Sequence, residues 1–358
     1  MKTARLQSLD IVRGLTVAGM ILVNNGYGGS FPMLQHASWN GLSVSDFVFP
    51  FFLFIMGVSL YLSLGKRGFK FTGQTFGKIV KRSVILLLIG VAINWFDMAI
   101  WGDGLSIGEL RFWAVLQRIA LCYFLVALFS LCGRPGLTLP LSVLLLVIYT
   151  VILVLGNGYS EVSSDNILYR VDESLFGDAH LYHKSAVDPE GLLSTISALV
   201  NTLLGFYCAK LFSREKELSD KIVSVFTLGS LLIVCGFLLN FFHPYNKHIW
   251  SPSFALVTSG SCALLLALTM KFVDKDHYDG VFSRIFKVFG SNALLLYVSS
   301  ELMAIIFGRI GLSEFFYNTI SSIIPMKEFV SLCYALLYVA MNFLIGYPLW
   351  KKRVYVKL

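Results

Sequence analysis

Polar and titratable residues gather in one short stretch, residues 35–57, of an otherwise apolar chain. Its first half surrounds one imidazole with amide, hydroxyl and carboxylate groups: His36, Ser38, Trp39, Asn40, Ser43, Ser45 and Asp46. Its second half, from Phe47, is an apolar run. Histidine, with a reference pKa of roughly 6.5, can accept or release a proton near neutral pH. The pattern indicates a reaction centre on a short connection between two hydrophobic segments, at a membrane face.

The composition assigns the chain to the membrane. Of its 358 residues, 56% are hydrophobic and only 14% are charged, whereas an average soluble chain has about 25% charged residues. No soluble domain hides that much apolar surface, so we expect an all-α, polytopic helical membrane protein in contact with lipid. The net charge of +8 does not indicate nucleic-acid binding, because basic and aromatic residues are not interleaved on a polar surface.

Ten segments are apolar and long enough to cross a bilayer as helices, which takes roughly 20 residues each. They lie near 9–25, 46–64, 83–100, 112–132, 138–155, 191–212, 222–241, 252–272, 288–307 and 328–349. No linker or repeat divides them, so we expect one transmembrane domain over residues 1–358. The long connection 156–190 is expected to fold over the outer opening of the bundle.

The distribution of basic residues predicts the orientation. Ten crossings put both termini on the same side of the membrane. When that side is the cytoplasm, 22 of the 29 Lys and Arg residues lie at or near the inner face, as is typical of cytoplasmic loops. We therefore expect both termini to be cytoplasmic.

No pattern indicates a metal site or a disulfide. The six cysteines lie in or beside apolar segments without a CxxC pair, and we interpret them as small hydrophobic residues. Two pairs of histidines are near each other in the sequence, His180 with His183 and His243 with His248. Such spacing is a weak metal signal by itself, and we expect solvated loop histidines.

The chain closely resembles the heparan-α-glucosaminide N-acetyltransferase family and its bacterial relatives. The resemblance is carried by LDIVRG, VNN, HASWNGLSVSDFVFPFFLFIMG, LQRIALCYFLVA (116–127), LFGDAHLY (175–182), DPEGLLSTISALVNTLLG (188–205), NKHIWSPSF (246–254) and GSNALLLYV (290–298). It covers nearly the whole chain in order, and the HASWNG block is its most specific part.

The resemblance implies a transmembrane acetyltransferase in the inner cell membrane. Such an enzyme moves an acetyl group from cytoplasmic acetyl-coenzyme A to the amino group of an amino sugar or glycan on the other side. The family's proposed catalytic histidine falls on His36, and the family suggests a homodimer. The lysosomal member carries an extra luminal domain and a leading helix that have no counterpart here, which leaves the acceptor open.

Acetyl transfer to an amine needs a base or a nucleophile, and a donor for the developing oxyanion. His36 can be either of the first two. Asn24 or Asn25, which end the first apolar segment, can direct an amide N–H at the thioester carbonyl. Asp46, ten residues after His36, can orient the imidazole. The alternative is that His36 only caps a loop and hydrogen-bonds a carbonyl.

No nucleotide-binding fingerprint occurs, so coenzyme A must be held by membrane helices and basic side chains. Lys78, Lys81 and Arg82 precede the third apolar segment at the inner face, where they can meet the phosphates. Ordinary topological anchoring explains their position equally well. Arg118 is also a candidate, since it lies seven residues after Arg111, about 10 Å deeper in the fourth segment.

Charges inside apolar segments are costly and tend to face the bundle interior. Arg118, Glu301 and Asp97 are such charges, and we expect them to form a structural pair or to line the path of the acetyl group. An alternative function is a transporter of amino sugars or glycan fragments in which His36 couples transport to proton movement. Transporters tend to have matching halves with broken helices, and the sequence shows no such symmetry.

Overall fold

The structure, a computed structural model, describes residues 6–102, 108–132, 135–182 and 184–356. Within these ranges every regular element is a helix and there is no strand, so the expected all-α class is confirmed. The chain forms two compact units. The first contains Met1–His36, Ser43–Phe52 and Leu265–Lys357, and the second contains Ala37–Leu42 and Leu53–Leu264. The polar stretch around His36 thus passes from the first unit into the second and back.

The first unit is built on α1. Its elements are α1 (Gln7–Asn24), η1 (Pro32–Leu34), η2 (Val44–Phe47), the start of α2 (Val48–Gly65), the π-helical turn η6 (Met270–Lys275), α10 (Val281–Ser291), α11 (Ala293–Arg309), α12 (Leu312–Ser321) and α13 (Lys327–Lys351). Helices α1 and α10 approach closely: a Cβ on Gly14 would lie 1.8 Å from the Phe286 carbonyl oxygen, and one on Gly290 would lie 1.8 Å from that of Asp10. Small residues permit such close packing between membrane helices. The packing fixes α1, which ends at Asn24, against α10.

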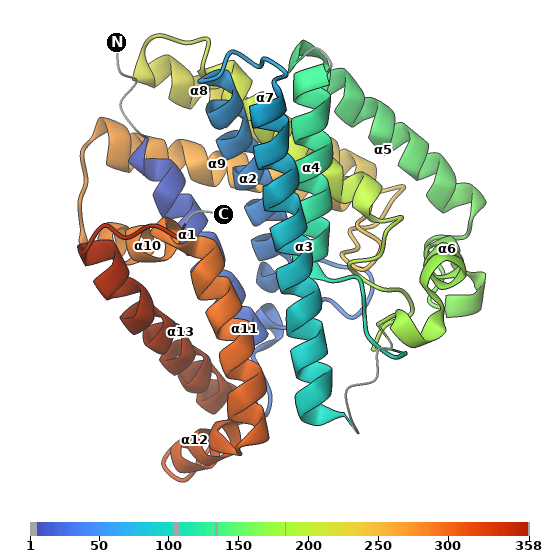
Figure 1. The fold of residues 1–358 in the computed structure, drawn as a ribbon, viewed down its shortest axis with the longest axis vertical. Coiled ribbons are helices and arrows are strands. Elements are labelled where there is room, and N and C mark those ends of the chain that lie inside the picture. The colour runs from blue at the N-terminus through green and yellow to red at the C-terminus, as the bar shows by residue number, and fades with distance from the viewer. Residues whose placement is uncertain (1–5, 103–107, 133–134, 183, 357–358) are drawn as a thin grey trace. The chain divides into compact units, whose positions relative to one another are not determined.

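The expected span 288–307 is broken at Asn292, where α10 and α11 meet at an angle of 81°. Figure 1 shows α10 turning into α11 at this corner. The Asn292 amide group donates to the Val354 carbonyl over 2.9 Å, and its Oδ1 accepts the Val356 N–H over 2.8 Å. The corner is therefore tied to the chain that follows α13, a contact that local sequence does not reveal.

The second unit contains the remaining helices. They are the rest of α2, α3 (Gly73–Trp101), α4 (Val115–Cys132), η3 (Pro135–Leu137), α5 (Thr138–Leu155), η4 (Ser163–Asp165), α6 (Ile167–Phe176), η5 (Asp178–His180), α7 (Thr195–Phe212), α8 (Leu218–Asn240) and most of α9 (Pro252–Thr269). The connection 156–190 is thus structured, since it contains α6 between two short 3₁₀ turns.

Eight helices of the described chain are long and apolar enough to cross a membrane, or nine if α10 and α11 together make one bent span. They make the protein a polytopic membrane protein, as its composition predicted. The ten expected spans included 9–25, but the corresponding helix α1 is not among the eight. Its first half carries the charged residues Asp10 and Arg13, which lower its hydropathy.

Candidate active site

His36 and Asp46 form a hydrogen-bonded pair in the first unit. The Nδ1 atom of His36 lies 2.8 Å from Oδ1 of Asp46. The Asp46 carboxylate is fully buried, whereas the side chain of His36 is 40% exposed. An ionised carboxylate can only accept a hydrogen bond, so the Nδ1 atom carries a hydrogen, and in the neutral ring the Nε2 atom then has the lone pair. The pair therefore presents a base or a nucleophile to its surroundings.

Local structure holds the Asp46 carboxylate in this position. Ser43 caps the 3₁₀ turn η2, and both its backbone N–H and its hydroxyl donate to Oδ2 of Asp46, over 2.9 and 2.8 Å. The neighbouring Ser45 hydroxyl donates to the Gln35 carbonyl over 2.8 Å, which ties the turn to the residue before His36. A serine with an acidic residue three positions later is a capping pattern, so the cap that holds the Asp46 carboxylate was readable in the sequence.

The segment 37–42 that follows His36 belongs to the second unit, where residues 245–248 and Tyr159 hold it. Four hydrogen bonds and one ring contact make this attachment: the Gly41 N–H to the Tyr245 carbonyl (2.8 Å), Asn246 to Asn40 (3.2 Å), His248 Nε2 to the Ala37 carbonyl (3.1 Å), the Trp39 indole N–H to the Tyr159 carbonyl (3.2 Å), and Trp39 stacked on His248. The two sequence blocks HASWNG and NKHIW are therefore neighbours in the fold.

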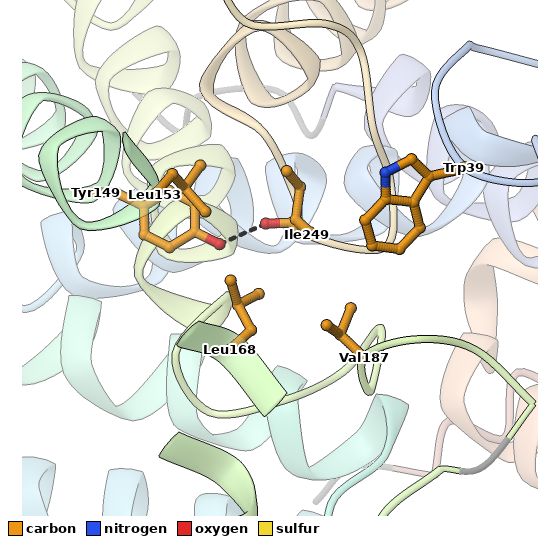
Figure 2. Packing of buried hydrophobic residues seen from close by; sticks show 6 residues of the cluster. All are labelled: Trp39, Tyr149, Leu153, Leu168, Val187 and Ile249. Carbon is orange, nitrogen blue, oxygen red and sulfur yellow. Dashed lines mark hydrogen bonds between the residues drawn. The ribbon is translucent and has the colours of Figure 1, made fainter. Parts of the chain in front are cut away.

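Trp39 also belongs to a buried apolar cluster that includes the connection 156–190. Figure 2 shows its members, which are Trp39, Tyr149, Leu153, Leu168, Val187 and Ile249. The Tyr149 hydroxyl donates to the Ile249 carbonyl within this cluster. Leu168 on α6 and Val187 thus anchor the connection inside the second unit.

The loop histidines are packed rather than solvated, which corrects the expectation. The Nδ1 atom of His248 lies 2.8 Å from the Ser185 hydroxyl, and that of His243 lies 2.9 Å from the Tyr159 hydroxyl. The His180 ring is hydrogen-bonded to the Leu110 carbonyl, and His183 lies outside the described residues. In the part of the chain that is described, no group of three or more His, Cys, Asp or Glu side chains is arranged to hold a metal ion.

The two candidate asparagines differ in their surroundings. Asn25 is buried, and its amide group donates to the Ile21 carbonyl over 2.8 Å, one turn back in α1. Asn24 is exposed, and its amide group lies 3.4 Å from Oε1 of Glu301 on α11. Asn25 therefore ends the helix, while Asn24 presents its amide group at the surface of the first unit. Glu301, which is half-buried on α11, thus meets the end of α1.

The basic residues proposed for coenzyme A are on α3 in the second unit. Lys78, Lys81 and Arg82 are exposed in its first three turns, because α3 begins at Gly73, about ten residues earlier than expected. The Arg82 guanidinium lies over the ring of Tyr123, 4.6 Å from its centre. This contact positions the cation without neutralising it.

Arg118 is placed differently from the sequence expectation. Helix α4 begins at Val115, so Arg118 is in its first turn rather than two turns deep. Its side chain is fully buried, it donates from Nη2 to the Gly191 carbonyl over 2.8 Å and to the Ser194 hydroxyl, and it lies over the Trp250 ring. Its Nε and Nη1 atoms have no hydrogen-bond partner among the described residues. The residue joins the start of α4 to the start of α7.

Acidic residues just before α7 form a cluster that sequence analysis did not single out. Arg111 bonds both oxygens of Asp188, over 2.5 and 3.1 Å, and Glu190 over 2.9 Å. Burial raises the pKa of Asp188 despite the nearby Arg111. Burial also acts to raise the pKa of Glu190, but Arg111 and Arg118 outweigh it and lower the pKa. The DPEG sequence at 188–191 was the available signal, since acidic residues beside an apolar segment usually have a partner.

Comparisons with known proteins agree with the sequence resemblance. Residues 5–164 match the family model described as heparan-alpha-glucosaminide N-acetyltransferase, catalytic. The chain is 32% identical to the heparan-alpha-glucosaminide N-acetyltransferase of Homo sapiens, over 83% of this chain and 53% of the human protein. It is also 32% identical to that of Mus musculus, over 84% of this chain and 54% of the mouse protein. The chain thus spans about half the length of the relatives it matches.

Proposed function

Because this chain belongs to the heparan-α-glucosaminide N-acetyltransferase family, we propose that it is a transmembrane acetyltransferase with His36 at its reaction centre. Its donor is acetyl-coenzyme A in the cytoplasm, and its acceptor is the amine of an amino sugar or glycan on the other side of the inner cell membrane. The observation that carries this proposal is the hydrogen bond between the partly exposed His36 and the buried Asp46, since it fixes the tautomer in which Nε2 of the neutral ring can accept a proton.

The reaction joins the amine nitrogen to the acetyl carbonyl carbon and breaks the carbon–sulfur bond of the thioester. The Nε2 atom of His36 takes the proton that the amine loses, and the thiolate of coenzyme A leaves and is protonated. Asp46 keeps the hydrogen on Nδ1 and stabilises the imidazolium that forms. Asn24 is the better placed of the two asparagines to donate to the oxyanion, because it is exposed and its contact with Glu301 is long, at 3.4 Å, whereas Asn25 is buried and bonds the Ile21 carbonyl over 2.8 Å.

His36 can also act as a nucleophile and carry the acetyl group on Nε2 before the amine attacks. Incubating the protein with labelled acetyl-coenzyme A in the absence of acceptor separates the two routes. Stoichiometric, acid-labile label on wild-type protein that is absent from His36→Ala supports the covalent route. The absence of label together with normal turnover supports direct transfer.

The main test replaces His36 by alanine. Purified protein is incubated with labelled acetyl-coenzyme A and a panel of amino sugars, and N-acetylated product is measured. We expect His36→Ala to lose at least about 99% of turnover, since a positioned base contributes about 10²–10⁴-fold. The control His277→Ala, at an exposed residue near α10, is expected to keep full turnover. Turnover above a few per cent in His36→Ala contradicts the proposal.

Donor binding is assigned to the exposed basic residues of α3. We expect Arg82→Ala to weaken acetyl-coenzyme A binding by about tenfold, because it removes a charge-assisted contact to phosphate. Lys216→Ala, an exposed basic residue between α7 and α8, is the control for general charge loss. Asn24→Ala is expected instead to lower the single-turnover rate with donor affinity nearly kept. If Arg82→Ala binds the donor as tightly as wild type does, the basic residues of α3 serve only to orient the protein in the membrane.

The broken span at Asn292 favours one competing function, a transporter in which His36 couples sugar movement to protons, because broken helices are a transporter feature. Vesicles containing the protein separate the two functions. Accumulation of labelled glucosamine without N-acetylation, in the absence of acetyl-coenzyme A, supports transport. Acetylation that depends on the donor, with no accumulation of free glucosamine, supports the transferase.

A further inference from the structure

A small pocket lies at the carboxyl-terminal end of α1, within the first unit. Its apolar walls come from α1, η1 and α13 and include Val23, Leu34 and Leu332. The residues with polar side chains that line it are Ser30, Ser331 and Glu328. The pocket has room for about one water-sized group, so a sugar ring does not fit inside it, whereas a single ammonium group does.

Residues that line the pocket are close in the sequence to both residues to which we assign the chemistry. Val23 in its wall directly precedes Asn24, and Leu34 in its wall comes two residues before His36. Two residues of chain span at most about 7 Å, so the backbone of His36 lies within that distance of the backbone of Leu34. The Gln35 amide group donates to the Ser30 carbonyl over 2.6 Å, which holds this part of the loop against the pocket.

The polar groups of the pocket are hydrogen-bond acceptors. The Ser331 hydroxyl oxygen accepts the Tyr27 N–H over 3.1 Å and lies 3.1 Å from the Ser30 hydroxyl. When Ser30 donates to Ser331, the lone pairs of the Ser30 oxygen stay available. The Glu328 carboxylate forms no hydrogen bond or ion pair with another described residue. Its position in the first turn of α13 stabilises the N-terminus of that helix only weakly, as one partly exposed charge does.

We propose that this pocket binds the protonated amine of the acceptor, with Glu328 as the residue that selects a charged amine over a neutral hydroxyl. The inference rests on the proposed acetyl transfer and names its amine-binding subsite. An ammonium group offers three N–H donors, which match the Glu328 carboxylate and the Ser30 hydroxyl. His36, two residues after Leu34 in the same loop, then removes the proton, and the neutral amine attacks the thioester.

The proposal makes a kinetic prediction that differs from that for a catalytic residue. Glu328 stabilises the ammonium form, which is the ground state, and not the transition state, in which the amine has lost a proton. Removing its charge should therefore raise KM for the amine without lowering kcat. A carboxylate that only stabilises the helix would affect neither constant.

The test uses Glu328→Gln in the full-length protein, with glucosamine as the amine and glucose as its neutral counterpart. We expect KM for glucosamine to rise about tenfold or more, the loss typical of one charge-assisted hydrogen bond, while kcat stays within about twofold. Displacement of glucosamine by glucose should become easier. Glu314→Gln, which removes an exposed carboxylate from the first turn of α12, should leave both constants unchanged.

Direct binding distinguishes a failure of this inference from a failure of the proposed function. Glucosamine and glucose binding are measured without donor, so the result does not depend on turnover. A loss of glucosamine binding in Glu328→Gln with glucose binding kept supports the subsite even if no acetyl transfer is found. Equal binding of glucosamine to wild type and Glu328→Gln overturns it. If Glu328→Gln does not fold, Ser30→Ala replaces it, and unchanged glucosamine binding in that variant overturns the proposal.

Discussion

At the residue scale, the candidate site depends on one buried carboxylate with two tasks. One oxygen of Asp46 faces the His36 ring, and the other accepts two hydrogen bonds from Ser43. An acceptor-only group satisfies all three donors at once. No neutral side chain of the same size can do so, because an amide has only one oxygen.

We therefore expect Asp46→Asn to lower kcat by about a hundredfold or more. If the oxygen of the new asparagine keeps the Ser43 contacts, its NH₂ group faces Nδ1 of His36. This contact stabilises the tautomer with hydrogen on Nε2, and in that tautomer the Nε2 atom cannot take a proton from the amine. Single-turnover acetyl transfer measures the effect. Asp220→Asn, an exposed acid in the first turn of α8, should leave the rate unchanged. A rate within threefold of wild type in Asp46→Asn contradicts the orienting role.

Asp172 on α6, in the connection 156–190, predicts a pH dependence of stability. Burial raises the pKa of its carboxyl group from 3.8 to about 6, and the negative charge of Asp188 adds to the rise, against the opposing effects of the Leu192 N–H and Arg118. The folded state thus binds a proton more tightly than the unfolded state does. This contribution to stability is full below about pH 4 and is lost as the pH rises to about 6.

We compare the thermal midpoints of wild-type protein and Asp172→Asn in detergent, because the pH dependence due to all other groups is common to both. Relative to the variant, the midpoint of the wild type should fall as the pH rises from 4 to 6. The asparagine keeps an acceptor for the Leu192 N–H, which bonds Oδ1 over 3.0 Å in the wild type, but it has no titrating charge. The difference between the two proteins should therefore change over this range. A difference that is constant from pH 4 to 7 contradicts the raised pKa.

At the element scale, Arg118 joins two helix starts across 73 residues of sequence. Its Nη2 atom bonds the Gly191 carbonyl and the Ser194 hydroxyl next to α7, while the guanidinium plane lies over Trp250. A planar guanidinium can donate in the ring plane and stack at the same time, whereas a lysine ammonium cannot. The geometry favours a structural role, in which Arg118 holds the start of α4 against the start of α7, over the contact with coenzyme A that the sequence suggested.

Arg118→Lys should lower the free energy of unfolding by about 3 kcal/mol, because it leaves buried acceptors unsatisfied. Thermal unfolding in detergent without donor measures this loss, and titration with acetyl-coenzyme A measures donor affinity in the same samples. Arg170→Lys, at an exposed position on α6, is the matched control. Full stability combined with weaker donor binding would restore the coenzyme A assignment.

At the scale of the whole molecule, the orientation in the membrane and the division of labour remain predictions. Among the described residues, eight or nine helices can span a membrane where ten spans were expected. If α1 also crosses and α10–α11 make one bent span, the number is even and both termini lie on the same side. The basic residues of the sequence favour this arrangement. We expect a single transmembrane domain to carry the donor to one face and the acceptor to the other.

Cysteine labelling tests this topology. Cys132, Cys235 and Cys333, which are exposed or partly exposed, are replaced by alanine, and the three buried cysteines are retained. An impermeant maleimide should label Ser164→Cys, which is exposed in the connection 156–190, on intact cells. Ser213→Cys, exposed between α7 and α8, should react only after permeabilisation. If instead Ser213→Cys is labelled on intact cells and Ser164→Cys only after permeabilisation, the protein has the opposite orientation in the membrane.

The sequence by itself determined the features that depend on composition and on near neighbours. Its apolar content made it a helical membrane protein. The pair of His36 and Asp46 could be expected because ten residues separate them, and Ser43 supplies a local cap for the turn between them. Short-range hydrogen bonds of this kind are available to the chain wherever it folds, so residue type and spacing are sufficient to predict them.

Only the tertiary structure decided which distant residues contact one another within each unit. It separated Asn24 from Asn25 by their partners, placed Arg118 against Gly191 rather than at a free surface, and broke the helix at Asn292 by contact with the end of the chain. It also brought Glu328 to a pocket beside Leu34. Apart from the bond of Asn25 to Ile21, these contacts join residues 64 to about 300 positions apart. They depend on how helices pack, which the periodicity of a single segment does not encode.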